Sequence, residues 1–168
     1  MFMITICCTS RLLKRTGFPA ETLVPEPTSA LGNWYANILF FHHRQALLFV
    51  SERSRLGVVT PAKEIRSLSN RLTEHLPVLL KRLNAKPEWI QEGNRKRADV
   101  RYAAPASRSV LGTMNDYKIQ IEALLEEDRE ASEIAIAFHL RSTPIGPLQY
   151  KSPEEVTLQL LKSSYEAG

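Results

Sequence analysis

The sequence predicts an α+β fold, with a mostly antiparallel sheet of four or five strands packed against three main helices. Strand-like runs gather in the first third of the chain, and helical patterns follow them. Three expected strands, 34–41, 46–51 and 56–60, are joined by short polar connections of hairpin length. These three strands are therefore expected to form an antiparallel meander.

The three main helices are expected at 63–84, at 107–127 and after Ser152 at the C-terminus. Ser107 stands before a periodic run and is typical of a helix N-cap. Pro77 should kink or divide the first of these helices, because proline removes a backbone donor and crowds the preceding turn. The apolar stripe of the middle helix, which should enter the core, consists of Val110, Met114, Tyr117, Ile121, Leu124 and Leu125.

Local patterns also predict shorter elements around this frame. Thr9 or Ser10 should cap a short helix that ends at Gly17. The segment 18–32, with three prolines, should be a mobile surface loop. The remaining expected elements are strands at 2–8, 100–103 and 148–150 and a helix at 87–91. Residues 129–140 contain a run that alternates like a strand, but their alanine-rich context favours a helix over a strand.

Length and composition indicate one soluble domain that spans residues 1–168. The two cysteines, Cys7 and Cys8, are adjacent and bond to each other only with severe strain, so they are expected to be free thiols in a reducing cytoplasm. The N-terminal run is short and lacks a basic region before it, which favours a first strand over a signal peptide. No membrane association is predicted.

The chain is basic, with a net charge of +4 and a pI near 9.2. Such a charge permits binding to nucleic acid or another polyanion. A dense group of basic residues has two interpretations. Its cations could bind phosphates, or the group could belong to a solvated loop, which would have much the same composition. The group consists of Arg95, Lys96, Arg97, Arg101 and Arg108.

The polar face of the 107–127 helix is the main candidate site. Arg108, Gly112, Asn115 and Asp116 should share that face. A glycine inside a helix costs about 1 kcal/mol relative to alanine, so Gly112 suggests that something approaches the helix closely there. That neighbour is either a ligand or another part of the same chain.

The sheet could contribute Trp34 and Asn37 to the same site. In an extended strand Trp34 points to one face, whereas Tyr35 and Asn37 point to the other. Asn37 could present its amide beside an aromatic ring, and Trp34 could equally anchor the sheet to a helix.

Nothing in the sequence predicts a metal or a cofactor. His42 and His43 are adjacent, and no cysteine or carboxylate accompanies them at ligand spacing, so an exposed turn is favoured over a metal site. The chain has no phosphate-binding glycine loop, no nucleophile elbow and no paired CxxC.

Four segments carry a family resemblance that extends over nearly the whole chain. They are R-S-V-L-G-T-M-N-D at 108–116, C-T-S-R-L-L-K-R at 8–15, W-Y-A-N at 34–37, and the S-T-P and Y-K-S-P elements near 142 and 150. With them the chain resembles an uncharacterised bacterial domain family of about this length. The resemblance implies a stand-alone bacterial cytoplasmic domain without an established activity, and it transfers no catalytic residue. The proline-rich stretch 19–27 departs from the pattern.

Two function classes are therefore compared. The first is a non-enzymatic binding or regulatory module with a basic surface, whose partner is nucleic acid or a protein. The second is a small enzyme for an anionic substrate, with Arg108 as an anion clamp and Asp116 as a general base. The enzyme requires these groups to meet in a pocket with a titratable partner such as His75 or His139.

Overall fold

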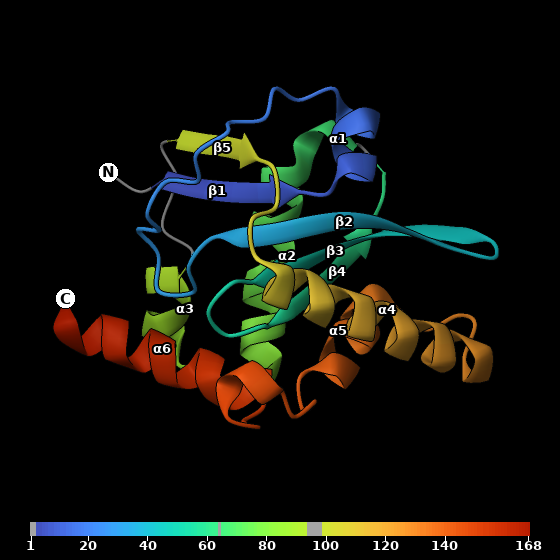
Figure 1. The fold of residues 1–168 in the computed structure, drawn as a ribbon. Helices are drawn as coiled ribbons and strands as arrows, with labels where there is room; N and C mark the ends of the chain where they lie inside the picture. Colours follow the sequence, from blue (N-terminus) through green and yellow to red (C-terminus); the bar gives the residue numbers. More distant parts are fainter. Residues whose placement is uncertain (1–2, 64, 94–98) are drawn as a thin grey trace.

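The computed structural model describes residues 3–63, 65–93 and 99–168. They form an α+β fold around a five-stranded sheet with the strand order β4-β3-β2-β1-β5 (Figure 1). The strands are β1 (Met3–Cys8), β2 (Trp34–Phe41), β3 (Arg44–Ser51), β4 (Gly57–Pro61) and β5 (Asp99–Ala103).

The expected meander is confirmed, but the sheet is mixed, so the prediction of a mostly antiparallel sheet was wrong. β2, β3 and β4 pair antiparallel, whereas β1 pairs parallel with both β2 and β5. Parallel neighbours need a long crossover connection, and the segment 9–33 supplies one between β1 and β2. The pattern of a single strand does not contain the direction of its partner, which is why the sequence did not show this.

Six α-helices lie within the described residues, where three main helices were expected. They are α1 (Ser10–Thr16), α2 (Leu68–Arg82), α3 (Pro87–Gly93), α4 (Arg108–Glu127), α5 (Glu133–Leu140) and α6 (Pro153–Ala167), with 3₁₀ turns η1 (Ile65–Ser67) and η2 (Gly146–Leu148). Predicted caps are confirmed at two of them. The Thr9 hydroxyl accepts from the Leu12 N–H, and the Ser107 hydroxyl accepts from the Val110 N–H at 3.2 Å.

Pro77 lies inside α2, which continues undivided with buried leucines before and after the proline, so of its two predicted effects the kink stays a prediction. One local prediction was wrong. Residues 148–150 are not a strand. Gln149 and Tyr150 have φ angles of 56° and 62°, which belong to the left-handed region and not to extended backbone. The helix expected at 129–140 is confirmed as α5.

Helices cover both faces of the sheet. In the view of Figure 1, α4 lies in front of the sheet and α2 behind it. Gly57 on β4 permits the close approach of α4 and α5, because a Cβ at that position would lie 3.2 Å from both Tyr117 and Leu140. The largest side chains with almost no exposed surface are Trp34, Tyr35 and Tyr117.

The 18–32 loop contains no helix or regular strand, and two features attach it to the sheet. Thr28 exchanges hydrogen bonds with the backbone of Met3, and Glu21 bridges to Ala103 on β5. Its expected mobility stays a prediction. Among the helices that the structure describes, none has the length and apolar character required to cross a membrane.

Candidate functional site

The predicted polar face of α4 is open to solvent. Arg108, Gly112, Asn115 and Asp116 are all exposed. A Cβ added at Gly112 would have no neighbouring atom within 4 Å, so no described part of the chain requires a glycine there. These four residues form an open surface, whereas the enzyme hypothesis requires them to meet in a pocket.

Gly112→Ala is therefore expected to stabilise the protein by about 1 kcal/mol, through the higher helix propensity of alanine in open space. Chemical denaturation followed by circular dichroism measures this change. Gly57→Ala is the matched control and should destabilise, because its Cβ meets Tyr117 and Leu140. A loss of stability in Gly112→Ala would show that something else contacts α4 at this position.

The structure separates the two predicted sheet residues from the polar face of α4. Trp34 is 1% exposed and lies on the sheet face opposite to Tyr35. Tyr35 is the residue that reaches α4, where its hydroxyl accepts a hydrogen bond from the Ser107 N–H at 3.0 Å. The Asn37 amide oxygen accepts from the Thr9 hydroxyl at 2.5 Å, which ties β2 to the start of α1.

The predicted basic group is only partly described. Arg95, Lys96 and Arg97 lie outside the described residues. Arg101 is exposed on the edge strand β5, 3.5 Å from the carboxylate of Glu21. Arg108 is exposed at the first turn of α4.

A buried polar cluster, which the sequence did not suggest, fixes α4 to the turn between β3 and β4. Arg55 is 7% exposed, and its guanidinium donates to Thr113 at 2.8 Å and to Ser109 at 3.1 Å. The Tyr117 hydroxyl donates to the Arg55 carbonyl at 2.6 Å. Burial lowers the pKa of Arg55 and raises that of Tyr117. These contacts position α4, and they leave little of Arg55 accessible to a ligand.

The two cysteines are buried and free of disulfide bonds. Burial raises the pKa of Cys7 to about 11 and that of Cys8 to about 12. A thiolate is the reactive form of cysteine, so neither side chain is suited to nucleophilic chemistry at neutral pH.

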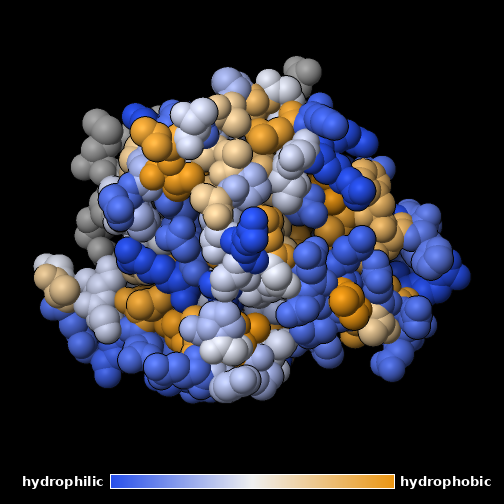
Figure 2. Space-filling view, viewed as in Figure 1, coloured by the Kyte–Doolittle hydropathy of each residue, from blue (hydrophilic) through white to orange (hydrophobic). Residues whose placement is uncertain are grey.

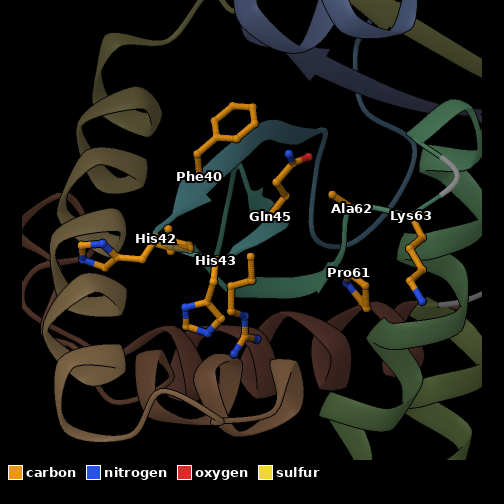
Figure 3. Close-up of a pocket in the computed structure, with 9 residues that line it drawn as sticks. Phe40, His42, His43, Gln45, Pro61, Ala62 and Lys63 are labelled. Carbon is orange, nitrogen blue, oxygen red and sulfur yellow. The ribbon is translucent and has the colours of Figure 1, made fainter.

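The β2–β3 hairpin extends beyond the other strands (Figure 1). Two hollows are lined by residues of this hairpin. The first hollow has a volume of about 720 Å³, and the residues on its wall include Phe40, Gln45 and Lys63 (Figure 3). The second hollow has a volume of about 650 Å³, and residues from the C-terminal half of α4 form one of its walls. Residues 40–43 contribute to both hollows.

The two hollows differ in charge. Glu122 and Glu126 line the second hollow, together with Arg129. The described residues that line the first hollow include no carboxylate, and their charged members are Lys63 and Arg44, of which Arg44 pairs with Glu133. An anion is therefore better accommodated in the first hollow.

Two arginines of α1 lie beside the exposed aromatic ring of this hollow. The guanidinium carbons of Arg11 and Arg15 are 5.5 and 5.7 Å from the centre of the Phe40 ring. Phe40 is 40% exposed, although it sits within a hydrophobic strand. Figure 2 shows an apolar stretch between the hydrophilic surfaces over α1 and α4, where Figure 1 places the hairpin.

Gln45 completes the hollow beside Phe40. The two residues are directly paired across β2 and β3, so their side chains stand on the same face. Figure 3 shows the ring and the amide rising next to each other above the hairpin. Within the described residues the Gln45 amide has no hydrogen-bond partner.

Arg44 holds the hairpin tip against the α4–α5 connection. Its guanidinium donates to the Ala131 carbonyl at 2.7 Å and pairs with the Glu133 carboxylate at 3.0 Å. The next two residues toward the tip, His42 and His43, are exposed. In the part of the chain that the structure describes, no three potential ligands converge on a metal position.

We define the hairpin site as Arg11, Arg15, Phe40, Gln45 and Lys63. Sequence reasoning missed it, although two signals were present. R-L-L-K-R places two arginines one helical turn apart, and the period of β2 puts Phe40 on one face with Trp34. Neither signal shows that α1 lies against the hairpin.

The structure describes an α+β domain in which two arginines of α1 lie beside an exposed aromatic ring of β2. The chain belongs to the family described as "Domain of unknown function (DUF6933)", whose model matches residues 5–156. The match agrees with the expected membership of an uncharacterised domain family. No curated protein and no solved structure matches the chain.

Proposed function

We propose that this protein is a non-enzymatic binding module that engages nucleic acid through the hairpin site. The observation that carries the proposal is the approach of Arg11 and Arg15 to the exposed Phe40, at the edge of a hollow whose described lining contains no carboxylate. Cations supply the affinity for a phosphate backbone, and an aromatic surface suits the bases.

The rest of the molecule is consistent with this role. The net charge of +4 favours a polyanionic partner over a neutral or basic one. The two free, buried thiols support the bacterial cytoplasm that we propose as the location of the protein, because a reducing compartment keeps cysteines unpaired. The exposed Arg108 and Arg101 would extend the basic surface for a longer strand.

Fluorescence anisotropy with a short labelled oligonucleotide tests the proposal. Binding should be measurable at low salt, and log K should fall linearly with log salt concentration. The double variant Arg11→Ala/Arg15→Ala should bind at least about tenfold more weakly at low salt. Its salt slope should be shallower by about 0.7 for each lost contact with a single strand.

The matched control is Lys151→Ala/Lys162→Ala, which removes two exposed cations from a distant part of the surface. It changes the net charge equally and should retain most of the affinity. Equal losses in the two double variants would contradict a located site and leave only general charge attraction. Absence of binding at low salt would reject nucleic acid as the partner and favour a protein partner, which a pull-down would then address.

A further inference from the structure

The hairpin site contains two groups that a phosphate backbone does not need. One is the Phe40 ring, exposed inside the hollow, and the other is the unpartnered Gln45 amide beside it. A site for phosphates alone requires cations and N–H donors, so the ring and the acceptor oxygen of the amide point to a different part of the ligand.

We propose that the bound nucleic acid is single stranded, and that one unpaired base stacks on Phe40 with its edge toward the Gln45 amide. This inference rests on the proposed function and names the ligand within it. The two arginines and Lys63 then contact the phosphates on either side of that base.

Geometry leaves one side of the ring available for a base. Arg11 and Arg15 are four residues apart and project from the same face of α1, so both approach Phe40 from the α1 side. Phe40 also lines the hollow, so the side of its ring that faces the hollow is accessible to a ligand. The volume of about 720 Å³ lies within the range of small-ligand pockets and accommodates a base with its sugar.

The amide has the donor and the acceptor that a base edge requires. Every nucleobase carries an adjacent donor and acceptor on its pairing edge, and a glutamine amide offers the complementary pair. In a duplex that edge is occupied and both faces of the base are stacked on neighbours. Only an unpaired base can therefore use Phe40 and Gln45 together.

Three probes that all carry a phosphate backbone test the inference on the full chain. They are a single-stranded oligonucleotide of mixed sequence, the same sequence as a blunt duplex, and a single strand made of abasic residues. The intact single strand should bind at least about tenfold more tightly than either of the others. Equal affinity for the intact and abasic strands would overturn the inference, while the proposed function would stand.

Substitution of the two residues assigns the effect to the hollow. Phe40→Ala should weaken binding of the intact strand by about tenfold or more and leave the abasic strand unaffected, whereas Phe40→Trp should keep the affinity. Gln45→Leu should weaken the intact strand alone. Tyr150→Ala is the matched control, since Tyr150 is an aromatic residue 77% exposed just after η2, and it should change nothing.

Two further outcomes separate the inference from its alternatives. A 2-aminopurine base placed in the strand should change its emission on binding to the parent and not to Phe40→Ala, and an unchanged emission with the parent would contradict stacking. Binding of a free mononucleotide as tightly as of the strand would also overturn the proposal, because the hollow would then be a nucleotide pocket. No binding of any probe would reject the proposed function itself.

Discussion

Trp34→Ala is expected to lower the free energy of unfolding by about 3–5 kcal/mol, the range typical of large buried aromatic residues. Trp34 is 1% exposed, and its removal leaves a cavity in the core that the paired strands β1 and β3 cannot fill. Urea denaturation with tryptophan fluorescence and circular dichroism measures the loss.

The experiment also decides between the two roles that the sequence allowed for Trp34. Trp34→Phe should remain folded and bind the oligonucleotide as the parent does, because Trp34 has almost no surface to offer a ligand. Trp89→Ala is the control for loss of a tryptophan, and it should cost less because Trp89 is only partly buried. A stable Trp34→Ala variant with impaired binding would place Trp34 in the binding site.

Tyr117→Ala is the second change with a large expected effect, about 3–5 kcal/mol. Tyr117 is completely buried, its ring fills the space above Gly57, and its hydroxyl donates to the Arg55 carbonyl at 2.6 Å. Tyr117→Phe keeps the ring and removes only the donor. It should cost about 1–3 kcal/mol, because the buried carbonyl is left without that partner.

The difference between the two Tyr117 variants measures the packing of the ring between β4 and α4. Tyr165→Ala on α6 is the matched control, since Tyr165 is 47% exposed, and it should change stability by less than about 0.5 kcal/mol. A loss in Tyr117→Phe as large as that in Tyr117→Ala would show that the hydrogen bond, and not the ring, holds α4 in place.

Local patterns were sufficient for most of the individual elements. The β2–β3–β4 meander, the Thr9 and Ser107 caps and the left-handed end of α1 at Gly17 are all present as expected. Each depends on a residue and its neighbours within a few positions, which is the range over which propensity and capping act.

Features that depend on residues far apart in the sequence could not be predicted from local patterns. The parallel pairing of β1 with both β2 and β5 requires long crossovers, whose path no local pattern contains. Pro77 does not divide α2 because buried leucines hold that helix against the core. In both cases tertiary packing outweighs the local preference.

The predicted site and the hairpin site differ for the same reason. Periodicity placed Arg108, Gly112, Asn115 and Asp116 on one polar face of α4, and the structure leaves that face open. Periodicity could not show that Arg11 of α1 lies beside Phe40 of β2, with Gln45 of β3 next to that ring.

The sequence by itself determined the approximate positions of most helices and strands, which of their faces are apolar, and that the chain is basic. Only the tertiary structure decided which cations and aromatic rings meet. Composition and periodicity act along one element, whereas the hairpin site is assembled from three elements by strand pairing and by the packing of α1 against the sheet.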